Sequence, residues 1–100
     1  MKQPTDALWQ AIESYDLTAI GSTIRFEDKL ALDNGWTLGF ATLVTAEYRK
    51  FLYLTQVAGR MVCPSDVVDQ AWHLHLTQTD SYAEYCQDVL GGFLHHYASK

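Results

Sequence analysis

Cysteine, proline and long apolar runs are all scarce in this chain of 100 residues. The only cysteines, Cys63 and Cys86, lack C-x-x-C spacing, and the opening MKQPTDALWQ has no apolar segment of the kind a secretory signal peptide needs. We therefore expect free thiols and a cytoplasmic protein. No stretch approaches the roughly 18 apolar residues that span a bilayer, which predicts a soluble chain.

Clustered positive charge is missing too. Seven Lys and Arg residues are scattered among twelve Asp and Glu residues, and the formal net charge is -5. A surface that binds a phosphate backbone or an anionic membrane needs a concentrated basic patch. We expect no nucleic-acid partner and no membrane partner, which leaves a protein partner open.

Motifs for phosphate binding and for nucleophilic catalysis are also absent. The chain has no glycine-rich phosphate loop and no G-x-S-x-G turn, and no motif pairs a nucleophile with a base. The sequence therefore assigns no reaction, and whether the protein is an enzyme stays open.

The residues that are present favour a folded helical protein. Hydrophobic residues make up 48% of the chain and charged residues 19%, a balance typical of a globular protein. The length suits a single domain over residues 1–100. Apolar spacing of three and four residues dominates, whereas the alternation of a strand is hard to find. We expect an all-α fold, a compact bundle of about five helices.

Start and stop signals divide the chain into these helices. Expected helices cover about Thr5–Tyr15, Phe26 to the DNG at 33–35, Thr37 to Gly59, the CPSD at 63–66 to Leu76, and Ser81–Leu90. The DLTAIGSTI between the first two reads as an extended connection with a turn. Phe40, Val44, Phe51 and Leu54 form the expected apolar stripe of the third helix. Ser81 and Glu84 match a capping box for the fifth.

The last two helices are expected to form an antiparallel helical hairpin around a short turn at residues 77–80. This pairing places His75 near Tyr82, and Trp72 near Tyr85 or Cys86. The Gly91–Gly92 pair can then reverse the chain.

The segment AWHLHL carries two histidines one residue apart. On a helix their side chains lie ~200° apart, so His73 and His75 cannot chelate one ion from a regular helix. His75 falls at the centre of a broad apolar face and should be buried. It then needs a hydrogen-bond partner, for example Tyr82 or a backbone carbonyl.

A metal site can still assemble from separate segments. Asp69 lies four residues before His73 on the polar edge of the fourth helix, and the chain reversal can return His95 and His96 toward them. Oxygen and nitrogen donors suit zinc or another divalent transition metal. The candidate ligands are Asp69, His73, His75 and His95.

Each feature also has a structural interpretation. Asp69 and His73 can form a surface pair at the start of a helix. His75 can be a core histidine, and His95 and His96 can belong to a polar terminus. Cys86 at helical spacing is interpreted as a small core residue, and Cys63 as a thiol ahead of a helix start.

A family resemblance rests on the segment PSDVVDQAWHLHL and on the Tyr, Cys, LGG and LHH that follow it. The matching positions are Pro64, Val68, Asp69, Trp72, His73, His75, Leu76, Tyr82, Cys86, Gly91, Leu94 and His95. These residues resemble the glycine-rich domain-containing protein-like family, and among its members the short stand-alone bacterial chains. The resemblance implies a helical domain without an established reaction. The glycine-rich tail of the plant members has no counterpart here.

Three functions are therefore considered. The first is a small cytoplasmic helical binding or regulatory module whose His/Asp cluster holds a divalent metal. The second is a metal-dependent enzyme that uses the same cluster to activate water. The third is a purely structural, hydrogen-bonded histidine cluster.

Overall fold

The computed structural model describes the backbone of residues 4–95 and the side chains of residues 7–95. Its elements are α1 (Pro4–Ser14), α2 (Phe26–Asn34), α3 (Leu38–Val57), α4 (Asp66–Thr77), α5 (Thr79–Tyr85) and the π-helical η1 (Cys86–Leu90). Residues 4–95 contain no strand, which confirms the all-α prediction.

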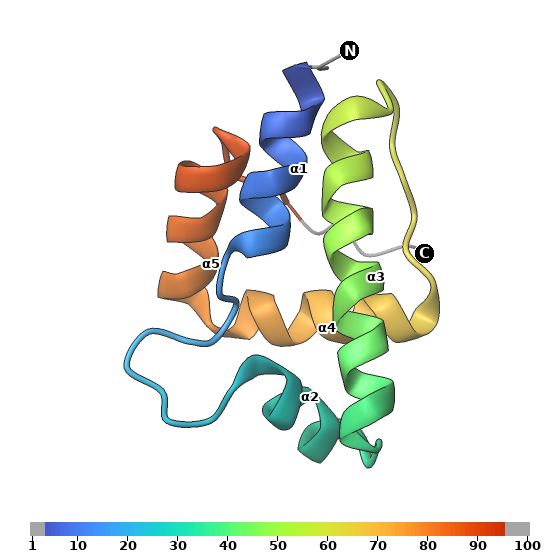
Figure 1. Ribbon diagram of the computed structural model, residues 1–100, viewed down its shortest axis with the longest axis vertical. Helices are drawn as coiled ribbons and strands as arrows, with labels where there is room; N and C mark the ends of the chain where they lie inside the picture. Colours follow the sequence, from blue (N-terminus) through green and yellow to red (C-terminus); the bar gives the residue numbers. More distant parts are fainter. Residues whose placement is uncertain (1–3, 96–100) are drawn as a thin grey trace.

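The long helix α3 is the element around which the others are arranged. It contacts α1, α2 and α4, and in Figure 1 it crosses in front of α4 with α1 on its left and α2 near its lower end. The helix α5 continues into η1, which packs against α1. The N-terminal and C-terminal helices of the described chain thus lie side by side (Figure 1).

The first four helices lie where they were predicted, and local hydrogen bonds define the ends of α2, α3 and α4. The side chain of Thr37 accepts a hydrogen bond from the Phe40 N–H at 3.1 Å, and that of Ser65 accepts one from the Val68 N–H at 3.3 Å. Both interactions satisfy amide groups that have no partner inside the helix. At the end of α2, Gly35 adopts φ +68° and its N–H bonds to Ala31, as expected for a left-handed helix stop.

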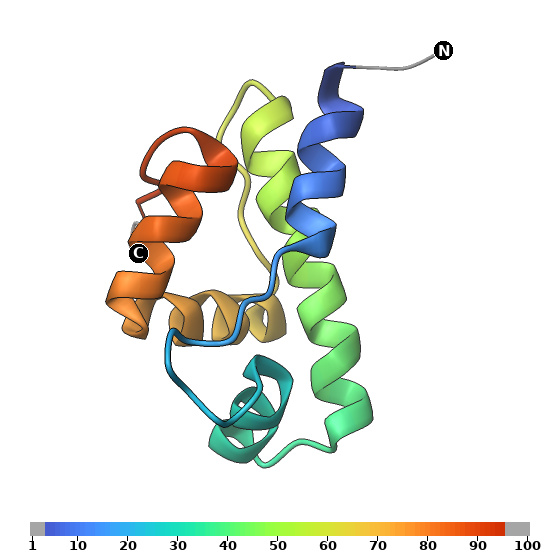
Figure 2. The ribbon, with the colours of Figure 1, turned by 60° about the vertical axis from the view of Figure 1, so that its left-hand side comes forward.

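The capping box predicted at Ser81 is wrong. The helix α5 begins at Thr79, and Ser81 is a buried residue whose hydroxyl accepts the Ile20 N–H at 2.9 Å. Gln78 separates α4 from α5, and Figure 2 shows α5 rising away from α4 rather than folding back along its length. After η1, Gly91 takes φ +81° and its N–H bonds to Cys86, so the predicted chain reversal is confirmed.

Half of the apolar stripe predicted for α3 faces outward. Val44 and Phe51 are buried, whereas Phe40 is 41% exposed and Leu54 is 46% exposed. The buried side is centred instead on Ala41, Tyr48 and their neighbours, because α2 and α4 both pack there. An apolar face of α3 is therefore left toward solvent.

The core cluster combines aliphatic and aromatic side chains from the α1–α2 connection and from every element from α2 to η1. Its members are Leu17, Phe26, Leu30, Ala31, Ala41, Val44, Tyr48, Phe51, Leu52, Val68, Ala71, Trp72, Leu74, Tyr82, Tyr85 and Cys86. Removing these apolar surfaces from water contributes the main favourable term to folding. None of the helices within residues 4–95 combines the length and apolar character required to cross a membrane.

Candidate functional site

His75 lies in the centre of the core, as the helix-wheel argument predicted. It is 1% exposed, and its Nδ1 lies 2.7 Å from the hydroxyl of Tyr48 on α3. The predicted partner was Tyr82 or a backbone carbonyl, so the identity of the partner is corrected by the structure. Four aromatic rings surround the imidazole at centroid distances of 4.9–6.0 Å, those of Phe26, Tyr48, Tyr82 and Tyr85.

This environment keeps His75 neutral. Burial lowers its pKa to about 3, and the positive charge of Arg49 acts in the same direction. Burial also raises the pKa of Tyr48 well above 10. The Tyr48–His75 hydrogen bond therefore joins two uncharged groups, and the imidazole carries a single proton over the whole physiological range.

A second hydrogen-bonded chain ties the C-terminal segment to α4. The Trp72 Nε1–H donates to the Tyr82 hydroxyl at 3.0 Å, and this hydroxyl donates to the Leu94 carbonyl at 2.6 Å. The predicted proximity of Trp72 to Tyr85 or Cys86 stays a prediction, and the structure adds a hydrogen bond from Trp72 to Tyr82. The Trp and the second His of the W-H-x-H segment thus both serve the packing of the bundle.

The connection between α1 and α2 is held over the α4–α5 corner by polar contacts. Besides the Ser81 bond to Ile20, the Thr18 side chain accepts the Phe26 N–H at 3.1 Å. The Arg49 Nη1 donates to the carbonyls of Ile12 and Tyr15, each at 2.7 Å, and so satisfies the end of α1. The predicted extended connection is therefore an ordered part of the structure.

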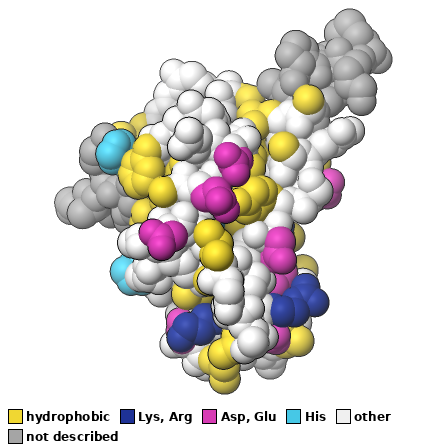
Figure 3. Space-filling view, turned by 90° about the vertical axis from the view of Figure 1, so that its left-hand side faces the viewer, with side chains coloured by type: hydrophobic (Ala, Val, Ile, Leu, Met, Phe, Trp, Pro, Cys, Tyr) yellow, Lys and Arg dark blue, Asp and Glu magenta, His cyan; other side chains and the backbone are white. Residues whose placement is uncertain are grey.

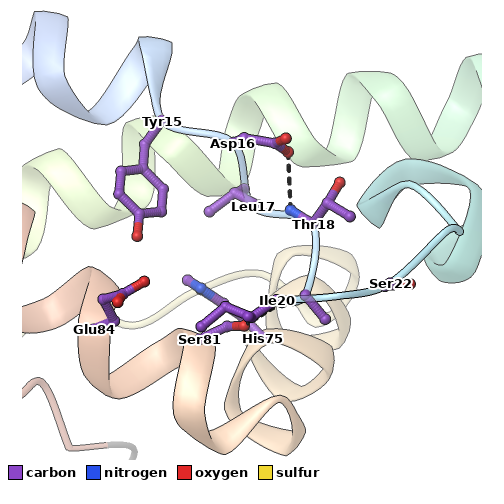
Figure 4. Close-up of a pocket in the computed structure, with 10 residues that line it drawn as sticks. Tyr15, Asp16, Leu17, Thr18, Ile20, Ser22, His75, Ser81 and Glu84 are labelled. Carbon is purple, nitrogen blue, oxygen red and sulfur yellow. Dashed lines mark hydrogen bonds between the residues drawn. The ribbon is translucent and has the colours of Figure 1, made fainter.

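Between this connection and the α4–α5 corner lies a cavity of about 430 Å³. Its lining residues are Tyr15, Asp16, Leu17, Thr18, Ala19, Ile20, Ser22, His75, Ser81 and Glu84. Figure 4 shows the side chains of Tyr15 and Glu84 facing one another at one end, with His75 and Ser81 below the connection. We call this cavity the 15–22 pocket.

The 15–22 pocket has an acidic and aromatic lining. Asp16 and Glu84 line it, and none of the described lining residues is Lys or Arg. Hydrogen bonds from the Thr18 backbone and side chain lower the pKa of Asp16, which keeps this carboxylate ionised. Burial raises the pKa of Tyr15, and the charges of Glu84, Asp88 and Asp16 add to this effect. The acidic groups thus act on Tyr15 with negative charge, while the positive charges of Arg25 and Arg49 act on Asp16 in the opposite sense.

A neighbouring cavity of about 540 Å³ is lined partly by residues of the same connection. It shares Tyr15, Asp16, Thr18 and Ser22 with the 15–22 pocket but also includes Arg25 and Arg49. Figure 3 shows the face that bears the connection, with acidic side chains over its middle and basic ones toward its lower end. The 15–22 pocket is the part without a basic lining residue.

The four predicted metal ligands lie in different environments in the part of the chain that the structure describes, and their role as ligands stays a prediction. His73 and His95 are exposed, Asp69 is half-buried, and His75 is buried with its Nδ1 against Tyr48. His95 packs edge-on against Phe93 at 4.8 Å between ring centroids. Within residues 4–95, no group of three or more His, Cys, Asp or Glu residues could hold a metal ion. His96 lies outside the described residues.

The two cysteines behave differently. Cys86 is buried in the core, as predicted, and Cys63 is exposed ahead of α4. Both are free thiols, which confirms that prediction.

Sequence reasoning missed Tyr48 and the whole 15–22 pocket. A signal for Tyr48 existed, because a buried histidine requires a partner and Tyr48 lies midway along the third helix. The pocket had no comparable signal, since Tyr15, Asp16 and Glu84 come together only through the path of an irregular connection.

Comparison with known proteins places most of the chain in one family. The model of the UCP032817-like family matches residues 23–100, from the end of the connection through every later element. No curated protein and no solved structure matches the chain.

Proposed function

The chain belongs to the UCP032817-like family, and from the geometry of this member we propose that it is a small helical binding module for a positively charged group. The observation that carries the proposal is the lining of the 15–22 pocket, which combines Asp16, Glu84 and the ring of Tyr15 without Lys or Arg among its described residues. The chemistry that fits is an alkylammonium, either of a free amine or of a lysine side chain. The 430 Å³ volume is within the range of small-ligand pockets.

Two interactions support this ligand class. The carboxylates of Asp16 and Glu84 are exposed at the pocket, so each attracts an ammonium with the modest energy of a surface charge pair. An aromatic face adds a cation–π contribution. The neutral state of His75 matters here, since a charged imidazole in the pocket wall would oppose a cation.

In this proposal the W-H-x-H segment supports the pocket rather than binding the ligand directly. The Tyr48–His75 and Trp72–Tyr82 hydrogen bonds fix α4 against α3 and α5, and Ser81 on α5 holds the connection through Ile20. This arrangement supports the structural interpretation of His75 that the sequence left open. The resemblance to the glycine-rich domain-containing protein-like family stays a prediction.

Titration with butylammonium, followed by amide chemical shifts in NMR spectra, tests the proposal. We expect shifts concentrated at residues 16–20 and 81–84, with butanol and butyrate as neutral and anionic controls. A blocked lysine amide in a parallel titration distinguishes a free amine from a peptide side chain. Glu84→Gln should weaken binding at least several-fold, whereas Glu47→Gln on α3 should leave it unchanged. Equal shifts from butanol and butylammonium would reject the charge-based proposal.

The metal-binding and metal-enzyme interpretations make a different prediction in the same protein. Stoichiometric zinc or iron in untagged protein, lost in His73→Ala and His95→Ala variants, would favour them over the amine pocket. The described residues supply no group of three donors in support.

A cytoplasmic location is proposed on the state of the thiols. Cys63 is exposed and Cys86 is buried, and neither forms a disulfide. Domains whose cysteines are not joined by a disulfide are typical of a reducing compartment. Fractionation of the native host would test this location directly.

A further inference from the structure

The outer side of α3 carries a regular pattern of exposed residues, of which Phe40 packs edge-on against Trp36 at 4.9 Å between ring centroids. Phe40, Leu43, Glu47, Lys50, Leu54 and Val57 follow one another at spacings of three, four, three, four and three residues. This is the spacing of the contact positions of a coiled coil. We call these six residues the α3 seam.

Every member of the α3 seam is exposed. Leu43 is 67% exposed, and Phe40, Leu54 and Val57 are 41%, 46% and 39% exposed. The two charged members form an exposed ion pair, with 3.1 Å between Lys50 Nζ and Glu47 Oε2. The residues that α3 buries are centred on Ala41 and Tyr48, on a different side of the helix from Leu43 and Lys50.

The surroundings of α3 leave this side accessible. In Figure 1, α1 lies to the left of α3 and the 58–65 segment to its right, and no described element is drawn in front of it. Figure 2 shows the N-terminal half of α3 at the edge of the molecule, while α1 accompanies its C-terminal half. The edge-on contact of Trp9 with Tyr53 at 5.7 Å marks where α1 packs. An approaching helix would therefore meet the α3 seam beside α1.

The order of residues along the seam is self-complementary. If a second copy of α3 is laid antiparallel about a two-fold axis midway between positions 47 and 50, Leu43 lies opposite Leu54 of the copy. Phe40 then lies opposite Val57, and Glu47 opposite Lys50, each time in both directions. Every apolar residue meets an apolar residue, and every charge meets its opposite.

We propose that the α3 seam is the interface of an antiparallel homodimer. A two-fold interface requires one patch to complement itself, and the Glu47–Lys50 pair satisfies this condition at the centre of the seam. The seam spans about 26 Å at 1.5 Å per residue, and a single helix face buries less than the roughly 800 Å² per partner of a standard interface. We therefore expect a weak, reversible dimer that forms at high protein concentration.

Sedimentation equilibrium of the full chain from about 5 to 500 µM tests the proposal. We expect a concentration-dependent rise from the monomer mass toward twice that mass. Leu43→Ser should lower the association constant at least tenfold, because it removes the apolar layer on both sides of the axis. Leu32→Ser is the matched control, since Leu32 on α2 is 73% exposed and lies outside the seam. A monomer at all concentrations, or equal effects of the two variants, would overturn the proposal.

Charge reversal identifies the pairing. Glu47→Lys and Lys50→Glu should each weaken self-association, because like charges then meet across the axis. An equimolar mixture of these two variants should associate at least tenfold more strongly than either alone, since each supplies the charge the other lacks. Asp33→Lys, which reverses one charge of the exposed Lys29–Asp33 pair on α2, should change nothing. Failure of the mixture to associate more strongly than its components would reject the antiparallel pairing. Circular dichroism spectra of all variants serve as the control for folding.

Discussion

Tyr48 and His75 are 27 positions apart in the chain and meet in the core through a 2.7 Å hydrogen bond between the Tyr48 hydroxyl and the His75 Nδ1. The two residues join the middle of α3 to the last turns of α4. Both side chains are almost fully buried, so neither can replace this bond with one to bulk water. Such a bond specifies how the two helices align as well as stabilising them.

Tyr48→Phe tests the strength of this contact. The variant keeps the ring and removes the hydroxyl, which leaves Nδ1 of His75 without its partner in a dry core. We expect the free energy of unfolding to fall by about 1–3 kcal/mol in urea denaturation. Tyr85→Phe is the control, because the buried Tyr85 hydroxyl has no hydrogen-bond partner among the described residues. Tyr85→Phe should leave the free energy of unfolding unchanged or raise it slightly. An equal fall of this free energy in both variants would show that the Tyr48–His75 hydrogen bond contributes no stability of its own.

The pH dependence of the free energy of unfolding should reveal the lowered pKa of His75. The pKa of His75 is lowered to about 3 in the folded protein, whereas an unfolded histidine titrates near 6.5. Between these values the unfolded chain binds more protons, so the free energy of unfolding falls as pH decreases from 6.5. The slope from this residue is about 1.4 kcal/mol per pH unit, or roughly 2 kcal/mol by pH 5.

Comparison with His75→Asn isolates that contribution from other titrating groups. Asparagine retains a hydrogen-bond acceptor for Tyr48 but does not titrate. We expect the difference in unfolding free energy between the native chain and the variant to shrink as pH falls from 7 to 5. A constant difference over this range would mean that His75 is protonated in the folded state as readily as in the unfolded state.

Tyr82→Phe should release the C-terminal segment. The hydroxyl of Tyr82 is both acceptor for Trp72 and donor to the Leu94 carbonyl, so its loss removes two hydrogen bonds at once. We expect limited proteolysis after residue 91 to accelerate several-fold. Trp72→Phe keeps the bond between Tyr82 and Leu94 and should leave cleavage of this segment closer to that of the native chain. Similar cleavage in both variants would contradict a role for the Tyr82–Leu94 bond.

The glycines at positions 35 and 39 offer a matched pair. Gly35 ends α2 at φ +68°, whereas Gly39 lies in the first turn of α3 without a positive φ, and at neither position would an added Cβ meet another atom within 4 Å. Gly35→Ala should destabilise by about 1 kcal/mol because a side chain disfavours the left-handed region. Gly39→Ala should stabilise by up to about 1 kcal/mol through its better helix propensity. Opposite shifts in thermal midpoint are the expected result.

The order of the helices followed from local chemistry, and so could be predicted. Thr37 and Ser65 begin helices because their side chains satisfy adjacent amides, and Gly35 ends one because it tolerates a left-handed backbone. These effects act within four residues of sequence. The burial of His75 was also predictable, since one helical wheel places it among apolar neighbours.

The parts that could not be predicted depend on contacts between distant segments. Ser81 and Glu84 have capping-box spacing, but the Ser81 hydroxyl is taken by Ile20, 61 positions away. Phe40 and Leu54 are apolar like the core residues of α3, and only the placement of α2 and α4 decides which apolar side is buried. The expected packing of α5 back along α4 also depends on distant contacts, and Figure 2 shows α5 rising away from α4 instead.

Ser81 and Tyr82 are neighbours in one turn of α5, yet they hold two segments from opposite ends of the chain. Ser81 retains Ile20 of the early connection, and Tyr82 retains Leu94 near the C-terminus. Unwinding that single turn would detach both segments in one event. Amide hydrogen exchange at Ile20 and in the segment after Gly91 should therefore share one opening free energy and respond together to temperature and denaturant.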